Sequence, residues 1–234
     1  MPSDVRETAC TLVRDGSVGL LLDAGTGVRR LVTDPAPVHG LERLYVCLTH
    51  FHLDHVIGLF YVGELGVPVE IWGAGETAEA TPTAELVARL LESPFAPPSF
   101  AASFADVHEL KEGEQMVGPF EIRARTQPLH TNPTLALRIG DELVLCTDTG
   151  YDEQNVDFAR GARVLLHEAF EADDSVGDAA HTSAGGAARI AAAAGVERLV
   201  LIHLNPLDAG EEALLSSAHE YFAATEVGRD GAEL

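Results

Sequence analysis

The sequence predicts an α/β protein in which two β-sheets lie between layers of helices, in the order αββα. Two observations lead to this prediction. A set of strand-like segments followed by alternating strands and helices occurs twice along the chain. No low-complexity tract or linker separates the two occurrences, so we expect a single domain over residues 1–234. A chain of this length can bury a core of the required size.

The first half of the chain is expected to form one sheet with helices on it. The turn at Asp15-Gly16 lies between two apolar runs and predicts a hairpin. The run RLYVCLTH at 43–50 is apolar throughout, as in a strand buried on both faces. Gly66 is a suitable stop for the helix before it. We expect, in order, strands at 8–14 and 18–23, a strand at 43–50, a helix at 55–66, a strand at 67–73 and a helix at 75–92.

The second half repeats the pattern after a proline-rich loop at 93–105, which is either a flap near a site or a plain surface connection. Gly140-Asp141 predicts a turn between two strands, and Gly195 predicts the end of a helix. The last ten residues show no clear pattern. We expect strands near 107–110, 114–117, 120–129, 134–139, 142–148, 163–170 and 198–206, and helices at 183–194 and 211–224.

Composition narrows the class of partner and the compartment. The net charge is −22, from 37 acidic and 15 basic residues, and such a surface repels polyanions, so long nucleic acid is disfavoured as a partner. No apolar stretch reaches the roughly 20 residues of a membrane span, and the N-terminus shows no secretory signal. The three cysteines are far apart and form no CxxC pair, which fits a reducing compartment. We therefore expect a cytoplasmic protein without a membrane partner.

The stretch THFHLDHVIGL at 49–59 places three histidines and an aspartate directly after a predicted buried strand. Histidine and aspartate are costly to bury without partners, so core packing is a poor explanation for His50, His52, Asp54 and His55. Imidazole and carboxylate groups together suit a zinc ion, and also manganese or iron. The stretch therefore predicts a metal site.

Three more candidate ligands, His130, Asp148 and His203, each follow a strand-like run. Ligands at the ends of several strands can meet at one edge of a sheet. Any one of these residues alone is as easily explained as an unrelated surface residue. The complete set in this order and context favours a metal site.

The pattern His50-x-His52-x-Asp54-His55, followed by His130, Asp148 in TDTG and His203 in IHLNP, resembles the metallo-β-lactamase superfamily over residues 20–206. The resemblance implies the four-layer αββα sandwich of that superfamily and two divalent metal ions, Zn²⁺ first, with Mn²⁺ or Fe²⁺ as alternatives. It assigns ligands as follows: His50, His52 and His130 on one ion; Asp54, His55 and His203 on the other; and Asp148 between them.

Two further stretches, HEAF at 167–170 and HTSAGGAARIA at 181–191, resemble the signatures of ribonuclease Z and its phosphodiesterase relatives. In that group the glutamate, here Glu168, orients the histidine, here His181, which can protonate the leaving oxygen. Asp54 would help to orient the attacking water. The alternative for His181 is a residue of a helix cap beside Thr182 and Ser183. We interpret His167 as a structural residue or as one that supports the site residues.

The resemblance implies a metal-dependent hydrolase, first a ribonuclease Z-like phosphodiesterase acting on small or short phosphodiesters. Ribonuclease Z enzymes that mature transfer RNA usually carry an arm between the third histidine and the bridging aspartate, where this chain has only residues 131–147. The alternatives are a lactone or ester hydrolase on the same metals, a precursor transfer RNA 3′ endonuclease and, least favoured, a non-catalytic metal-binding protein. A homodimer is considered as a further partner. Arg123, Arg125 and Arg138 form either a small anion-binding patch or ordinary solvated strand residues.

Overall fold

The computed structural model describes residues 6–97, 104, 106–172, 180–205 and 210–233. The chain separates into two compact units, each with one β-sheet and its own helices. The first unit takes the residues before 112 together with 116–120, and the second takes 112–115 and the residues from 121 onward. The expectation of a single domain stays a prediction. Among the described residues, no helix is long and apolar enough to span a membrane.

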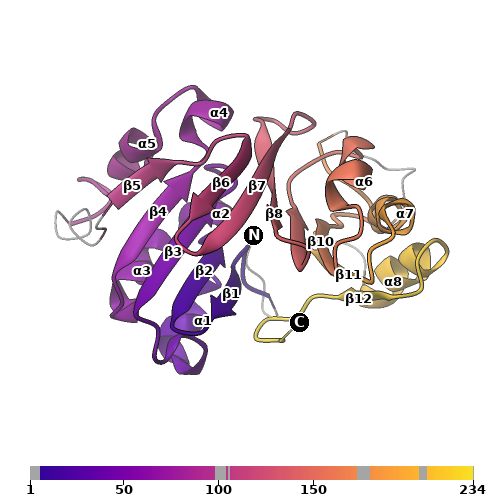
Figure 1. Cartoon of the computed structure of the whole chain (residues 1–234), viewed down its shortest axis with the longest axis horizontal. Coiled ribbons are helices and arrows are strands. Elements are labelled where there is room, and N and C mark those ends of the chain that lie inside the picture. The colour runs from indigo at the N-terminus through magenta and orange to yellow at the C-terminus, as the bar shows by residue number, and fades with distance from the viewer. Residues whose placement is uncertain (1–5, 98–103, 105, 173–179, 206–209, 234) are drawn as a thin grey trace. The chain divides into compact units, whose positions relative to one another are not determined.

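The first unit contains a five-stranded sheet whose order follows the sequence (Figure 1). The first two strands form the predicted hairpin around Asp15-Gly16, with Gly16 at a φ of 57°. The remaining neighbours are parallel. The strands are β1 (Thr11–Asp15), β2 (Val18–Leu22), β3 (Arg43–Leu48), β4 (Val69–Gly73) and β5 (Asp106–Glu109).

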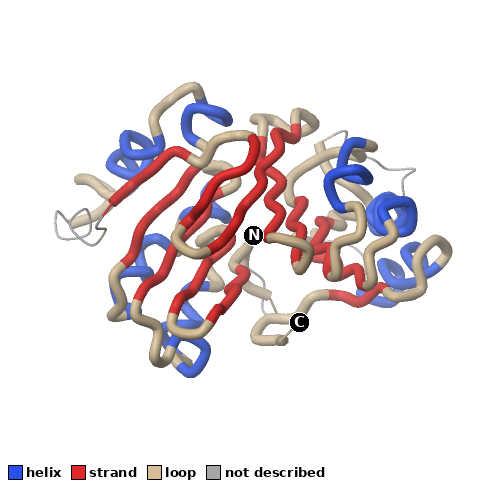
Figure 2. The backbone as a smooth tube through the Cα atoms, viewed as in Figure 1, coloured by secondary structure: helices blue, strands red, loops and turns tan. Residues whose placement is uncertain are grey.

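Helices of the first unit pack on this sheet through apolar side chains, and the tube in Figure 2 shows them beside the strands. Val28, Val56 and Leu59 come from helices and share one core with Leu21 and Val46 of the strands. The helices are α1 (Val28–Thr33), α2 (Leu53–Val56), α3 (Leu59–Val62), α4 (Gly75–Glu79) and α5 (Thr83–Leu90), with 3₁₀ turns η1 (Ala36–Val38) and η2 (Gly63–Leu65).

Two predicted helices of this unit are interrupted. The segment 55–66 divides into α2, α3 and η2, although Gly66 ends it in a left-handed conformation as expected. The segment 75–92 breaks because Ala80 adopts a φ of 50° and Pro82 follows it. Most of the proline-rich loop at 93–105, including 98–103 and 105, lies outside the described residues.

The second unit is built on a seven-stranded sheet of order β12-β11-β10-β9-β8-β7-β6. The strands β9 to β12 are parallel to one another, whereas β8 is antiparallel to both β7 and β9. The predicted turn at Gly140-Asp141 joins β8 and β9. The strands are β6 (Gly113–Val117), β7 (Phe120–Gln127), β8 (Thr134–Ile139), β9 (Leu143–Cys146), β10 (Val164–Glu168), β11 (Arg198–Ile202) and β12 (Thr225–Val227).

Three helices cover part of this sheet: α6 (Gln154–Ala159), α7 (Ala184–Ala194) and α8 (Glu211–His219). The middle one, α7, begins and ends as predicted. The Ser183 hydroxyl accepts a hydrogen bond from the Gly186 N–H at the start, and Gly195 is left-handed at the end. Its alanines let the helix approach the sheet closely, and Ala187, Ala188 and Ala191 are fully buried. β12 and α6 were not predicted, because both are short and lack a clear apolar period.

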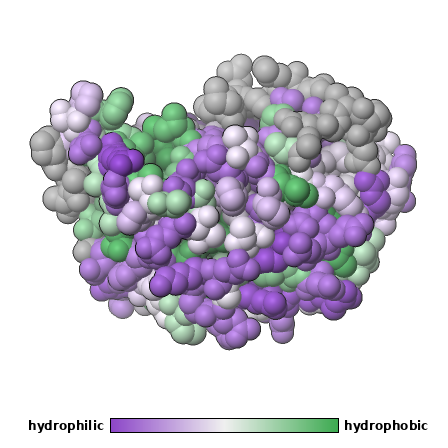
Figure 3. Space-filling view, turned by 90° about the horizontal axis from the view of Figure 1, so that it is seen from above, coloured by the Kyte–Doolittle hydropathy of each residue, from purple (hydrophilic) through white to green (hydrophobic). Residues whose placement is uncertain are grey.

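The parallel strands of the second sheet determine where polar side chains gather. Because β9, β10 and β11 run in the same direction, their carboxyl ends lie at one edge of the sheet. Asp148, Glu168 and His203 all lie at these ends. On the surface, the face seen in Figure 3 is largely hydrophilic, with smaller hydrophobic patches, as the excess of acidic residues leads us to expect.

Candidate metal centre

In the first unit, the four candidate ligands lie on a loop and a short helix directly after β3. His50 and His55 are buried, and their ring centroids are 4.2 Å apart. The ring of His52 lies 4.6 Å from that of His50. The Nε2 atom of His55 is 3.8 Å from Oδ2 of Asp54. The sequence therefore brings all four side chains into one cluster within this unit.

Asp23 and Thr49 contact the two buried histidines of this cluster at their Nδ1 atoms. Oδ2 of Asp23 lies 2.8 Å from Nδ1 of His55, and the Thr49 hydroxyl donates to Asp23 at 2.9 Å. Because the single hydroxyl proton of Thr49 is directed to Asp23, its oxygen can accept from Nδ1 of His50, 3.1 Å away. Both imidazoles then carry their proton on Nδ1 and present the Nε2 lone pair. This second layer of contacts is typical of histidines that bind metal ions.

Two glycines allow the loop after β2 to lie against this cluster. A Cβ atom on Gly25 would come 2.2 Å from the carbonyl oxygen of Asp54, and one on Gly58 would come 2.0 Å from the carbonyl oxygen of Gly25. The Gly58 N–H donates to the Ala24 carbonyl at 2.7 Å. No side chain fits at either position, so Gly25 and Gly58 allow the backbone next to Asp23 to approach this cluster. Asp23 itself was not predicted as a site residue.

In the second unit, two histidines approach the same carboxylate. Oδ1 of Asp148 lies 3.6 Å from Nε2 of His130 and 3.4 Å from Nε2 of His203. Asp148 and His203 have φ values of 50° and 48°, a region that non-glycine residues rarely adopt. Strained backbone of this kind is concentrated at functional sites. Nδ1 of His130 is hydrogen-bonded to the Ala180 carbonyl at 3.0 Å, which leaves Nε2 as the ligand atom.

Glu168 and His181 lie beside these ligands. Nδ1 of His181 is 2.7 Å from Oε2 of Glu168, and the His181 ring stacks on Phe170 with centroids 4.3 Å apart. The Thr149 N–H donates to the other carboxylate oxygen of Glu168. Burial, followed by the charge of Asp148, raises the pKa of Glu168 well above its usual value, while His203 and the N–H donors oppose this effect. The contact with Glu168 fixes the orientation of the His181 imidazole.

His181 also lies near the candidate ligands themselves. Ligand atoms of Asp148, His181 and His203 all fall within 4.8 Å of one another. His181 is therefore close enough either to act on a molecule bound at the metals or to bind an ion directly. The helix-cap role belongs to Ser183.

Other polar groups near the strand ends have structural roles. Nδ1 of the buried His167 is hydrogen-bonded to the Glu168 carbonyl at 2.9 Å, and burial lowers the pKa of His167 to about 4, so that it is neutral. Burial raises the pKa of the Cys146 thiol to about 12, which excludes a thiolate there at neutral pH. The hydrogen bond of His167 supports a structural role for this residue, and Cys146 is a small buried residue.

The three strand arginines are engaged with protein groups. Arg125 is paired with Asp152 at 2.7 Å, and Arg138 is paired with Asp141 at 2.6 Å. Arg123 lies over the ring of Phe158 at 5.7 Å. These contacts favour ordinary strand residues over an anion-binding patch.

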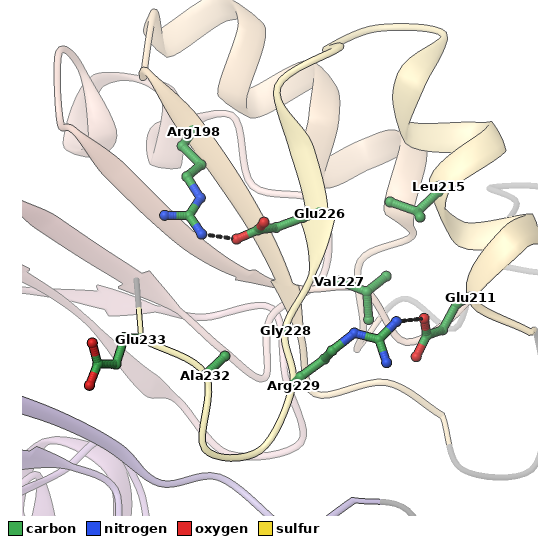
Figure 4. Close-up of a pocket in the computed structure, with 9 residues that line it drawn as sticks. All are labelled: Arg198, Glu211, Leu215, Glu226, Val227, Gly228, Arg229, Ala232 and Glu233. Carbon is green, nitrogen blue, oxygen red and sulfur yellow. Dashed lines mark hydrogen bonds and ion pairs between the residues drawn. The ribbon is translucent and has the colours of Figure 1, made fainter. Parts of the chain in front are cut away.

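A surface pocket on the second unit is lined by residues of β11, β12, α8 and the chain after β12 (Figure 4). Its lining includes the ion pair of Arg198 with Glu226 and the pair of Arg229 with Glu211, the latter at 2.5 Å. None of the predicted site residues lines it. Because four of its five charged groups form these two pairs, we assign it no function.

The donor sets of both units fit divalent metal ions. Imidazole nitrogens and carboxylate oxygens are zinc ligands at about 2.0–2.2 Å, and two such ligands around a tetrahedral ion lie about 3.4 Å apart. The distances from Asp148 to its two histidines, 3.4 and 3.6 Å, agree with this spacing. The fixed Nδ1 contacts direct the lone pairs of His50, His55 and His130 to Nε2.

Comparisons with known proteins agree with the fold. Residues 19–204 match the family described as a beta-lactamase superfamily domain. Ribonuclease Z of Methanopyrus kandleri is 29% identical over 265 residues, covering 99% of this chain and 92% of that protein. Ribonuclease Z of Mycobacterium sp. strain KMS is 33% identical over 249 residues, covering 91% and 84%. The metallo-β-lactamase fold protein YhfI of Bacillus subtilis has a TM-score of 0.78 at 23% identity, covering 99% and 92%.

The chain belongs to the metallo-β-lactamase superfamily and is ribonuclease Z-like. It is, accordingly, a metal-dependent hydrolase. The α/β fold class predicted from the sequence is confirmed by the shared fold of YhfI and by the mixed sheets with their helices.

Proposed function

We propose that this protein is a dinuclear metal-dependent phosphodiesterase that acts on small or short phosphodiesters. His50, His52 and His130 would hold one ion, and a second set would hold the other, with Asp148 shared; the second set is Asp54, His55 and His203. When bound, two divalent ions make water more acidic and offset the negative charge that builds up on the phosphate oxygens. Zn²⁺ suits this donor set best, followed by Mn²⁺ or Fe²⁺.

The pair of Glu168 and His181 is the observation that carries the proposal. Oε2 of Glu168 holds Nδ1 of His181 at 2.7 Å, so the proton that His181 can give away is on Nε2. An alkoxide leaving group needs such a proton as the bond to phosphorus breaks. Asp54, with a partly exposed side chain, would orient the attacking water and accept its proton.

The relatives named ribonuclease Z support a second candidate, a precursor transfer RNA 3′ endonuclease. Against it, the chain between His130 and Asp148 forms the hairpin of β8 and β9, and this hairpin leaves no residues for a protruding arm. The net charge of −22 also repels a long polyanion. We therefore place small diesters first.

A substrate panel with one metal-loaded preparation tests the proposal. We expect bis(p-nitrophenyl) phosphate and short diesters to be hydrolysed, and precursor transfer RNA to be a poor substrate whose binding weakens steeply with salt. Efficient 3′ processing at physiological salt would favour the second candidate. Turnover of lactones or carboxylic esters, with none of diesters, would overturn the proposal.

A further inference from the structure

Three side chains of the second unit form a stack on its surface. The guanidinium of Arg189, on α7, lies over the ring of Tyr151 at 5.4 Å and over the ring of Tyr221 at 5.0 Å. Both tyrosines are exposed, at 42% and 46%. An arginine over an aromatic ring is a common contact in proteins, and exposed rings of this kind can also stack on planar or charged ligands.

The stack lies close to the candidate ligands of the same unit. Tyr151 follows Asp148 by three residues, so their Cα atoms are at most about 11 Å apart. The intervening loop is tied to its neighbours. The Thr182 hydroxyl, next to His181, donates to the Thr149 carbonyl at 2.6 Å. The Gly150 N–H donates at 2.5 Å to the carbonyl of Leu129, the residue before His130. Tyr151 is therefore placed at the margin of the proposed site.

Near the start of α7, Gly186 makes room for the ring of Tyr151, and Gly185 makes room for the Ser217 hydroxyl. A Cβ atom on Gly186 would lie 3.2 Å from Cδ2 of Tyr151, and one on Gly185 would lie 3.5 Å from Cε2 of Tyr221 and 2.9 Å from the Ser217 hydroxyl. Glycine is a poor helix former, and both glycines lie within an eleven-residue helix. Gly186 allows the Tyr151 ring to lie against the first turn of the helix, whose cap residue, Ser183, follows His181 by two residues.

We propose that Tyr151, Arg189 and Tyr221 form a platform that binds the planar base of a nucleotide diester. This inference rests on the proposed phosphodiesterase function and narrows its substrate class to diesters that carry at least one nucleoside. A tyrosine ring stacks on any base, so the preference is for a base over none rather than for one base over another. The Arg189 guanidinium adds a local positive charge to a strongly acidic chain.

The affinity for a nucleotide tests directly whether the platform binds a base. We would compare adenosine 5′-monophosphate with ribose 5-phosphate, which lacks the base, by calorimetry on the metal-loaded protein. Stacking on one aromatic ring is expected to make the nucleotide bind about 10-fold or more tightly than the sugar phosphate. Tyr151→Ala should remove this difference and leave ribose 5-phosphate binding unchanged, whereas Tyr151→Phe should keep it. Tyr61→Ala removes an exposed tyrosine of the first unit and serves as the matched control.

Kinetic measurements distinguish a failure of the base platform from a failure of the proposed phosphodiesterase function. A dinucleotide and its doubly abasic analogue have the same scissile diester, so the ratio of their kcat/KM values reports the contribution of the bases. We expect a ratio of about 10 or more in the wild type and near 1 in Tyr151→Ala, with Tyr221→Ala intermediate. Hydrolysis of both compounds at equal rates by the wild type would overturn the platform alone. Hydrolysis of neither would overturn the proposed function.

The same variants also test whether a second copy of this chain, and not a base, covers these three side chains. If Tyr151→Ala or Tyr221→Ala converted a dimer into monomers in sedimentation, the stack would be a contact between copies of this chain and the base platform would be rejected.

Discussion

The two ligand sets differ in how the chain assembles them. In the first unit, the candidate ligands lie within six consecutive residues, 50–55. The buried Asp23 contacts His55 directly and His50 through the Thr49 hydroxyl. In the second unit, the ligands come from separate strand ends and depend on the register of parallel strands. The comparison indicates that the first set is organised by local contacts, and the second by the whole sheet.

The largest effect is expected from Asp148→Ala. The candidate ligands His130 and His203 both lie close to the Asp148 carboxylate. In the proposed function, Asp148 is a ligand of both ions. We expect the loss of at least one tightly bound ion and a fall in activity well beyond the 10–100-fold typical of losing a supporting residue. Elemental analysis after dialysis and turnover of bis(p-nitrophenyl) phosphate measure the two effects. Two retained ions would contradict the assignment.

His181→Ala tests the proton donor. General acid catalysis is worth about 10²–10⁴ in rate when the leaving group needs a proton. p-Nitrophenolate leaves without one, so the loss should be small with bis(p-nitrophenyl) phosphate and large with an alkyl or nucleoside diester. Glu168→Gln should give the same pattern more weakly, because it would only misorient the imidazole.

Metal content decides between the two roles open to His181. It should stay unchanged in His181→Ala and Glu168→Gln if His181 is the proton donor. A lost ion would make His181 a ligand, as its distance to Asp148 and His203 also permits. Equal losses with both leaving groups at full occupancy would make it structural.

Asp23→Asn tests the support beneath the first set. An amide keeps the size of the side chain but cannot hold the Nδ1 proton of His55 as a carboxylate does. We expect metal affinity to fall about 10–100-fold, as measured by chelator competition. Asp106→Asn removes the same charge from an exposed position of β5 and is the control. Similar affinities of the two variants would show that Asp23 does not support the ligands.

The difference between the two ligand sets also explains which site residues could be predicted from the sequence. The contiguous set was visible as a crowded motif, and the dispersed ligands were visible only because each follows a strand-like run. Asp23 was missed because a single acid after a strand has no distinguishing pattern; its role appears only when β2 and β3 pair. The break at Ala80 was missed because alanine and glutamate favour helix, although Pro82 is a signal for a break in the sequence. The ligand assignments themselves stay predictions until metal is measured.

The smallest effect concerns His167, a buried group in the second unit. Burial lowers the pKa of His167 to about 4, whereas in the unfolded chain it is about 6.5. Between about pH 6.5 and 4, His167 binds a proton in the unfolded chain but stays neutral in the folded protein. The stability that neutral His167 allows is therefore complete above about pH 6.5 and is lost as the pH falls toward 4. From pH 7.5 to 5.5, this loss is about 1 kcal/mol.

Urea unfolding of the metal-free protein at these two pH values measures the loss. His167→Gln does not titrate, so its free energy of unfolding should fall by about 1 kcal/mol less than that of the wild type over the same interval. Other groups titrate equally in both proteins and cancel in this difference. His219→Gln, at an exposed position of α8, should behave as the wild type. If His167→Gln and the wild type lost the same stability, His167 would have to be as free to take a proton in the folded protein as in the unfolded chain.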